Sequence, residues 1–234
     1  MRDIHCHILP GVDDGAHDLA ESLAMLQAAK EAGVTSIVCT PHARDPHFDY
    51  EAMWNAYELL VSHAEGFPLQ MGFEVNYTLL QKLGEDWIDR LAFDAQTAPP
   101  GWLDTLYDEG FGPSGEFLLE LPEYIDSYDL RDIDRTIYEI QSRGYQVIIA
   151  HPERYLPVQE NPLMVEDWVR QGCKLQASAD FLEDGRTGAA LEPAQAIFRE
   201  RLYSYIASDA HRVRHYALLA EACRSYRTRG AHAR

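Results

Sequence analysis

Hydrophobic and polar positions repeat one arrangement several times along the chain. A stretch with helical periodicity ends near a glycine, a short apolar run rich in β-branched residues follows, and a polar residue closes that run. The first example begins at Asp18, the predicted N-cap of a helix that stops at Gly33. The residues that follow, "TSIVCTPH", predict a strand that ends at His42.

This arrangement predicts seven strands, separated for the most part by helices. Such alternation is typical of a parallel α/β sheet with crossover helices. Seven units in 234 residues indicate one domain, residues 1–234, with a closed TIM-like barrel or a distorted relative of it. An open doubly wound sheet is the alternative, but no GxGxxG motif follows any predicted strand. The predicted strands are "DIHCHI", "TSIVCTPH", "LQMGFEVN", "GEFLLELPE", "QVIIAHPER", "KLQASAD" and "YSYIASDAH".

One irregular stretch, residues 93–115, departs from this pattern. Its glycine, proline and acidic residues predict a long loop or lid rather than a regular element. Loops of this length in compact domains are usually functional or mobile.

Composition narrows the classes of function. The chain has 20 Lys and Arg against 38 Asp and Glu, a net charge of −18, and should repel nucleic acid and anionic membranes. Neither a membrane-spanning apolar run nor a signal peptide is evident, so we expect a cytoplasmic protein without membrane insertion. The four cysteines are far apart and form no CxxC pair, which predicts free thiols. The oligomeric state is not determined by the sequence.

Imidazoles and carboxylates recur where the predicted strands end. In parallel α/β folds these ends meet on one face, where active sites form. Each residue alone is more simply read as structural, but buried charges must be paired or bind metal, and so many on one face favour a metal centre. Imidazole mixed with carboxylate suits Zn²⁺, Mn²⁺ or Fe²⁺. The residues are His5 and His7, His42, Glu74, Glu120, His151, and Asp209 with His211.

The spacing of the first two histidines has a geometric reason. Residues i and i+2 of a strand share a face, so His5 and His7 can chelate one ion while Cys6 points into the opposite packing layer. Asp209 and His211 have the same spacing, although a turn there would alter their relation.

These motifs resemble the PHP (polymerase and histidinol phosphatase) superfamily. Its marks include an N-terminal HxH, a strand-end "TPH" and a late DxH. More narrowly, the chain is similar to the bacterial tyrosine-protein phosphatases of capsule and exopolysaccharide operons, and the similarity spans nearly the whole chain except residues 94–115. The resemblance implies a distorted (β/α)7 barrel. The matching stretches are "DIHCHILPGVDDG", "GVTSIVCTPHAR", "GFEVNY", "AHPERY" and "IASDAH".

The resemblance also implies a centre of three divalent ions, with manganese as the first choice and iron or zinc as alternatives. It takes Asp14 rather than Asp13 as a ligand, a choice that the sequence alone leaves open. The implied ligand groups are His5, His7, Glu74 and Asp209; Glu74 as a bridge with Glu120 and His151; and Asp14, His42 and His211.

The activity implied by the resemblance is that of a metal-dependent phosphomonoesterase, a protein-tyrosine phosphatase. Its expected substrate is the tyrosine-rich tail of a bacterial tyrosine kinase of capsule or exopolysaccharide biosynthesis. Hydroxide formed from a metal-bound water would attack the phosphotyrosine. Arg154 and Arg44 are expected to contact the phosphate, since the planar arginine fork suits it. For a further arginine that the family often places after the DxH, Arg212 and Arg214 are both candidates.

Other functions remain as alternatives. A small-molecule phosphatase of the histidinol phosphatase type would use the same centre, whereas the net charge argues against a nuclease. A non-catalytic metal-binding scaffold is disfavoured by the full set of ligands. A cysteine phosphatase needs C-x5-R, but only four residues separate Cys39 from Arg44.

Overall fold

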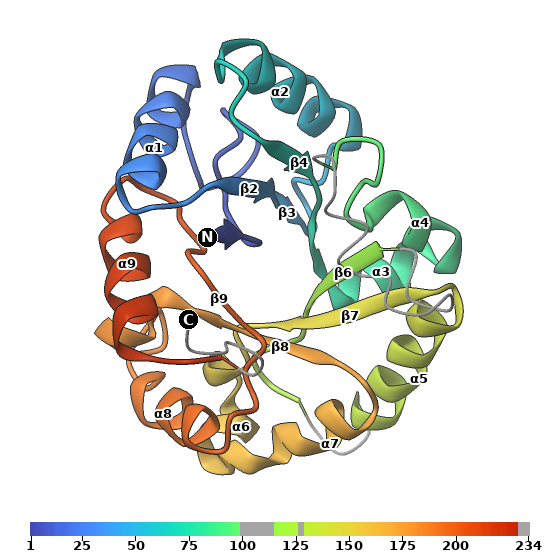
Figure 1. The fold of residues 1–234 in the computed structure, drawn as a ribbon. Coiled ribbons are helices and arrows are strands. Elements are labelled where there is room, and N and C mark those ends of the chain that lie inside the picture. The colour runs from blue at the N-terminus through green and yellow to red at the C-terminus, as the bar shows by residue number, and fades with distance from the viewer. Residues whose placement is uncertain (99–114, 126–128, 229–234) are drawn as a thin grey trace, which may run out of the picture.

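The computed structural model describes residues 1–98, 115–125 and 129–228. Its strands are parallel, which confirms the predicted α/β class, and they curl around a common centre (Figure 1). Two sheets are formed, in the orders β1-β2-β4 and β3-β5-β6-β7-β8-β9. The strands are β1 (Arg2–Asp3), β2 (Ser36–Cys39), β3 (His42–Ala43), β4 (Leu69–Met71), β5 (Glu74–Asn76), β6 (Gly115–Glu120), β7 (Tyr145–Ala150), β8 (Lys174–Ser178) and β9 (Tyr205–Ala207).

The second and third predicted strands are each interrupted. Pro41 separates β2 from β3 and lacks the N–H that a continuous ladder needs. Gly72 separates β4 from β5 at a close approach, because an added Cβ would lie 2.6 Å from the ring of Phe93 and 2.8 Å from Val38. Each broken strand contributes one piece to each sheet, so the two sheets are continuous along the chain.

The first predicted strand is shorter than expected, because its regular pairing ends at Asp3. Beyond that point the Thr40 hydroxyl accepts a hydrogen bond from the Cys6 N–H at 2.9 Å, in place of a ladder carbonyl. Cys6 also forms an isolated parallel bridge with Ala210, and the Asp209 N–H donates to the His5 carbonyl at 2.8 Å. The first and last strand segments therefore lie side by side.

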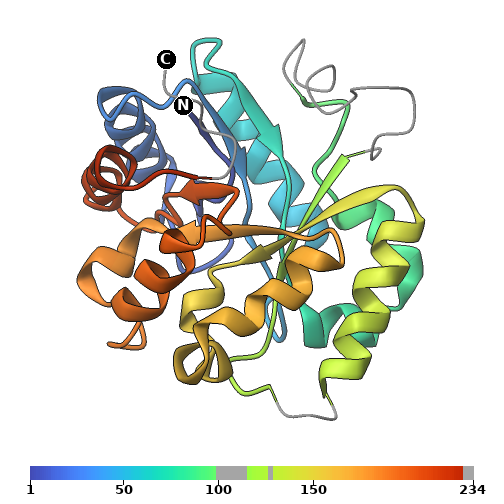
Figure 2. The same ribbon diagram turned by 60° about the horizontal axis from the view of Figure 1, so that its bottom comes forward.

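Helices form an outer layer around the strands (Figures 1 and 2). The predicted first helix is confirmed: its N-cap Asp18 accepts from the Glu21 N–H, and Gly33 beyond its end has φ +84°. The helices are α1 (Leu19–Glu31), α2 (Tyr50–His63), α3 (Tyr77–Leu83), α4 (Ile88–Leu91), α5 (Asp129–Ser142), α6 (Leu156–Glu160), α7 (Val165–Arg170), α8 (Leu191–Arg199) and α9 (His215–Ser225), with short 3₁₀ turns η1 (Glu85–Trp87), η3 (Pro152–Arg154), η4 (Pro162–Met164) and η5 (Ala179–Glu183).

Apolar side chains form two separate layers. A small inner cluster fills the space enclosed by the strands, and a larger outer cluster lies between strands and helices. The inner cluster includes Ile4, Val38, Leu118, Ile148 and Ala207, all at most 1% exposed. Polar groups lie beyond this inner cluster at both ends of the strands. The predicted site lies at the carboxyl ends.

Two further expectations concern membrane insertion and the long loop. Within the described ranges, every helix is too short or too polar to cross a membrane. Most of the predicted loop over 93–115 lies outside the described residues, which stop at 98 and resume at 115.

Candidate metal centre

The nine predicted ligands come together at the carboxyl ends of the strands. His151 directly follows β7 and Asp209 follows β9, and both have positive φ, 29° and 47°. This backbone conformation costs non-glycine residues of order 1 kcal/mol or more and is concentrated at functional sites. Both side chains are at most 4% exposed, whereas the Asp14 side chain is 48% exposed. The site thus has a buried floor and one carboxylate at its solvent side.

The first ligand group has the dimensions of a chelate. The Nε2 atoms of His5 and His7 lie 3.1 Å apart. The Oδ1 atom of Asp209 is 3.3 Å from His5 Nε2 and 3.1 Å from His7 Nε2, and Glu74 Oε2 is 3.4 Å from His7 Nε2. An ion with bonds of about 2.1 Å holds tetrahedral ligand atoms about 3.4 Å apart. His5, His7 and Glu74 therefore lie at the spacing of ligands of one ion, and a place for Asp209 on that same ion stays a prediction.

Three of the imidazoles are held in one orientation. In each, Nδ1 donates to an acceptor of the protein, which leaves Nε2 to face the neighbouring ligand groups. Metal-ligating histidines are typically oriented in this way. The pairs are His5 with Gln176 Oε1 at 3.0 Å, His7 with Asp13 Oδ2 at 2.8 Å, and His211 with the Asp209 carbonyl at 2.9 Å.

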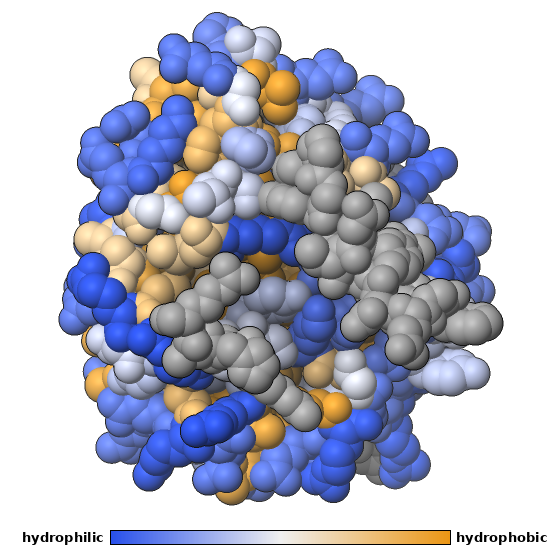
Figure 3. Space-filling model, viewed as in Figure 1, coloured by the Kyte–Doolittle hydropathy of each residue, from blue (hydrophilic) through white to orange (hydrophobic). Residues whose placement is uncertain are grey.

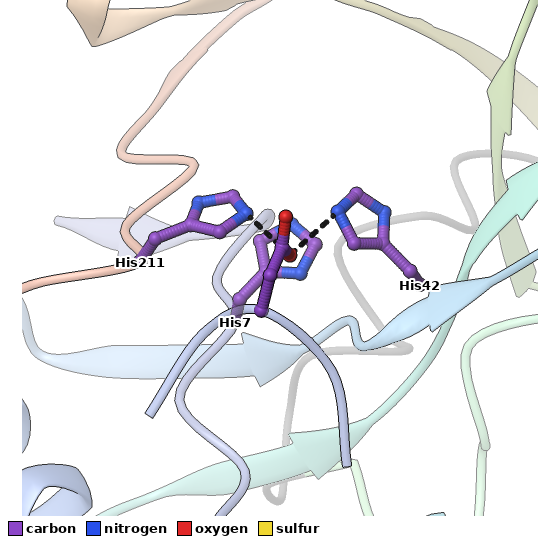
Figure 4. A group of neighbouring side chains, drawn as sticks. His7, His42 and His211 are labelled. Atoms are coloured by element: carbon purple, nitrogen blue, oxygen red, sulfur yellow. Dashed lines mark ion pairs between the residues drawn. The ribbon is translucent and has the colours of Figure 1, made fainter. Parts of the chain in front are cut away.

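A second set of side chains gathers around Asp14. Its Oδ1 atom lies 3.2 Å from the Nε2 atoms of both His42 and His211. Figure 4 shows these two rings on either side of the carboxylate, with the His7 ring behind, stacked on His211 with centroids 4.0 Å apart. Asp13 is already used, because it accepts from His7, from the Gly15 N–H and from the His42 N–H. The geometry thus favours Asp14 over Asp13 as the ligand.

Glu74 links the two sets. Its Oε1 atom accepts from His151 Nε2 at 2.7 Å, and its Oε2 atom lies 2.6 Å from His42 Nδ1 without hydrogen-bond alignment. Glu120 is farther away, with Oε1 4.0 Å from His151 Nε2. Both ring nitrogens of His42 and Oε2 of Glu74 are buried without a hydrogen-bond partner among the described residues. Such orphaned atoms fit ligands of a cation.

Buried charges in the site shift one another's pKa values. Burial disfavours protonation of His5, but the carboxylates of Glu74 and Asp209 outweigh it and raise the pKa of His5 to about 9. Burial opposes and Glu74 favours protonation of His42, with a resulting pKa of about 10. Although burial raises the pKa of Glu74, His5 and His42 bring it well below its usual value. Protonated imidazoles balance the carboxylates here, and divalent cations supply the same charge when bound.

The predicted phosphate-contacting arginines differ in their surroundings. Arg154 is 7% exposed, and its Nη2 donates to Ser178, Asp180 and Asp209, the last at 2.5 Å. Arg154 therefore forms part of the wall that holds Asp209. Arg44 is 39% exposed and lines a pocket of about 360 Å³ together with Asp14, His42 and other residues.

Neither candidate after the DxH lies free beside the ligands. Arg212 donates from Nη1 to the backbone carbonyls of Asp14 and Gly15, at 3.0 and 2.7 Å, and so supports the loop that carries Asp14. Arg214 is an exposed residue at the start of α9.

The cysteine alternative meets a physical obstacle. Cys39 is fully buried, and burial raises the pKa of its thiol. A neutral thiol without access to solvent is neither an effective nucleophile nor reachable by a substrate.

Sequence reasoning missed several residues that touch the ligands, of which two bear most directly on the site. Gln176, in the middle of β8, orients His5, and Arg186, in the loop between η5 and α8, lies 2.6 Å from His211. A polar residue at an inner position of a buried strand was the available signal for Gln176. Arg186 was signalled by its position in the loop after the sixth predicted strand, at the same face as the ligands.

The chain is similar to curated tyrosine-protein phosphatases. The tyrosine-protein phosphatase YwqE of Bacillus subtilis is 30% identical over 220 residues, which cover 92% of this chain and 78% of the relative. The tyrosine-protein phosphatase CpsB of Streptococcus pneumoniae is 28% identical over 222 residues, 90% of this chain and 83% of the relative.

A solved structure and a family model extend the likeness to the fold. A chain from the crystal structures of YwqE and CpsB, described as metal-dependent tyrosine phosphatases, superposes with a TM-score of 0.68 at 27% identity, covering 96% of this chain and 87% of that one. The model of the CpsB/CapC capsular polysaccharide synthesis family matches residues 1–95 and 116–232, and so omits most of the predicted loop. The chain belongs to this CpsB/CapC family, which confirms the resemblance inferred from its motifs.

Proposed function

We propose that this chain is a metal-dependent protein-tyrosine phosphatase. The observation that carries the proposal is the set of imidazole Nε2 atoms and carboxylate oxygens 3.1–3.5 Å apart, with Nδ1 of His5 and His7 already held by the protein. Divalent ions bound there lower the pKa of a coordinated water toward neutrality and neutralise phosphate charge.

The residues of the chain have distinct tasks in this proposal. Gln176 and Asp13 orient the imidazoles of His5 and His7, and Arg154 fixes Asp209. Arg44, exposed in the pocket beside Asp14, binds a phosphate oxygen of the substrate. Tyrosine leaves as a phenolate of pKa about 10, so strong general-acid assistance is less necessary than for an alkyl phosphate. A phosphate contact by Arg154 stays a prediction, supported by its place next to Asp209.

The proposed centre holds three divalent ions, with manganese as the first choice and iron or zinc as alternatives. The three ligand groups are those implied by the family resemblance, and Glu74 lies between two of them, as a bridging carboxylate would. The mixture of imidazole and carboxylate suits these metals.

We further propose that the curled sheets form one distorted (β/α)7 barrel in a single domain. The support is the contact of the first and last strand segments through Cys6 and Ala210. The proposed location is the cytoplasm, supported by four unpaired cysteines, which suit a reducing compartment. The proposed substrate is the phosphorylated tyrosine-rich tail of a bacterial tyrosine kinase of capsule or exopolysaccharide synthesis, in keeping with the family.

The experiment that tests the function compares three substrates on the manganese-loaded protein. Rates on phosphotyrosine peptides, phosphoserine peptides and histidinol phosphate are measured before and after EDTA treatment. We expect the highest kcat/KM on phosphotyrosine and loss of all turnover with EDTA. Equal or faster turnover of histidinol phosphate would instead indicate a small-molecule phosphatase. A Cys39→Ser variant serves as the control and should keep its activity, since the thiol takes no part.

A further inference from the structure

Arg186 occupies an unusual place beside the metal centre. It lies in the loop between η5 and α8, next to two residues of left-handed conformation, Asp184 (φ 63°) and Gly185 (φ 60°). The loop is anchored at both sides of Arg186, because the Gly185 N–H donates to the Asp180 carbonyl and the Thr187 hydroxyl accepts from Gln159 at 2.9 Å. Its backbone is therefore held while the Arg186 side chain reaches toward the ligands.

The contacts of Arg186 leave its charge poorly matched. Its Nη2 atom lies 2.6 Å from Nε2 of His211, and Nη1 is 3.9 Å from Oδ2 of Asp14. Because His211 Nδ1 donates to a backbone carbonyl, Nε2 presents a lone pair, and Arg186 donates to it. An imidazole lone pair is a weak partner for a guanidinium, and the side chain is 45% exposed. Among the described residues, no carboxylate pairs with Arg186 in a bidentate way.

The other arginines at this face divide into two kinds. Arg154 and Arg212 are committed to the protein, the first to Asp209 and its neighbours and the second to backbone carbonyls. Arg44 and Arg186 are half-exposed, and each approaches the same Oδ2 atom of Asp14, at 3.3 and 3.9 Å. Two guanidinium groups thus converge on one anionic oxygen at the solvent side of the ligands.

We propose that Arg186 binds the phosphate group of the substrate, opposite Arg44. This inference rests on the proposed function. A cation at the His42, Asp14 and His211 group would take the His211 lone pair that Arg186 now contacts, and its guanidinium would then be available to a phosphate dianion. The planar fork of arginine favours two parallel hydrogen bonds to phosphate oxygens.

The test compares Arg186→Gln and Arg186→Lys with wild type, and with Arg170→Gln as a matched control. Arg170 lies on α7 with a side chain 68% exposed and takes no part in the site. Four quantities are measured: KM and kcat for p-nitrophenyl phosphate, the same for a phosphotyrosine peptide, the inhibition constant of inorganic phosphate, and manganese content by elemental analysis.

For Arg186→Gln we expect KM for both substrates and the inhibition constant of phosphate to rise about tenfold, the loss of one charge-assisted contact. Manganese content should be unchanged, the lysine variant should be intermediate, and Arg170→Gln should match wild type. An unchanged inhibition constant overturns the inference, as does an effect confined to the peptide or a fall in manganese content. If wild type does not hydrolyse phosphotyrosine, the proposed function fails, and calorimetric binding of inorganic phosphate to the manganese-loaded proteins still decides the role of Arg186.

Discussion

The two ends of the strands both bury charged residues, but only one end resembles a binding site. At the amino ends, Glu116 is 1% exposed and accepts from Arg2 at 2.7 Å and from the Tyr205 hydroxyl at 2.6 Å, with Lys174 Nζ 3.6 Å away. Figure 1 shows the start of β1 near the middle of the face in view. Figure 3, drawn from the same side, shows hydrophilic residues there. This network contains its own counter-charges.

At the carboxyl ends the counter-charges among the described residues are mainly imidazoles, whose charge depends on protonation. Glu120 lies on the same strand as Glu116, four residues later, yet it faces His151 at 4.0 Å and belongs to a group with orphaned atoms on His42 and Glu74. The Nε2 atoms of His5 and His7 there face the carboxylates of Glu74 and Asp209. Buried charge alone therefore does not indicate a metal site. Unpaired ligand atoms at chelate spacing do.

The largest effect is expected from removing the HxH pair. A His5→Ala/His7→Ala variant should lose bound metal and more than about a hundredfold of its activity, because even partners behind ligands are worth 10–100-fold. Elemental analysis of protein purified without chelator, with p-nitrophenyl phosphate turnover, measures this. Full metal content in the variant would refute the first ligand group.

At the amino ends, Glu116→Ala should reduce the free energy of unfolding by about 3 kcal/mol, since Arg2 and Lys174 lose a buried partner. Urea unfolding measures the loss. At urea concentrations too low to unfold Glu116→Ala, its metal content should equal that of wild type. A variant that loses metal instead of stability would erase the distinction between the two ends.

A smaller effect is expected from Asp13→Ala. Asp13 fixes the tautomer of His7, so metal affinity should fall about 10–100-fold without loss of the fold. Manganese titration of chelator-treated protein measures it. Asp14→Ala is the companion variant, and because Asp14 is placed as a ligand, it should lose more affinity than Asp13→Ala. If Asp13→Ala lost more metal affinity than Asp14→Ala, Asp13 and not Asp14 would be the ligand.

The stabilisation that the two ends contribute should depend on pH in opposite directions, and it should change gradually with pH. Burial raises the pKa of Glu116, but Arg2 and its other partners bring it below 4.5, so its stabilisation is present above that pH and is lost as pH falls through the lowered value. The pKa of His5 is raised from 6.5 to about 9. Protonated His5 therefore stabilises the metal-free, EDTA-treated protein fully below pH 6.5, and this stabilisation is lost as pH rises through 9.

Thermal unfolding of EDTA-treated protein from pH 4 to 10 tests these signs. In Glu116→Gln, the thermal stability should fall less steeply at acid pH than in wild type. Its dependence on pH in the alkaline range should be unchanged. An EDTA-treated protein equally stable at pH 7 and 9.5 would contradict the raised pKa of His5.

Much of the site followed from spacing along the chain. His5 and His7, two residues apart, lie on one side as predicted, and Cys6 between them is buried in the outer apolar layer, although the regular strand ends at Asp3. Other details did not follow. The break at Gly72 was not predicted, because it depends on contacts with Phe93 and Val38, and the break at Pro41, which the missing N–H of proline signals, was overlooked.

The sequence by itself determined the class of fold and eight of the candidate ligands, because periodicity and chain order decide which residues meet at one face, and the family resemblance added Asp14. Only the tertiary structure decided that Asp13 orients His7 while Asp14 faces His42 and His211, and that Gln176 and Arg186 touch the ligands. These relations join residues as many as 197 positions apart, as in the pair of Asp14 and His211. They depend on strand pairing, loop conformation and side-chain direction, which local sequence does not encode.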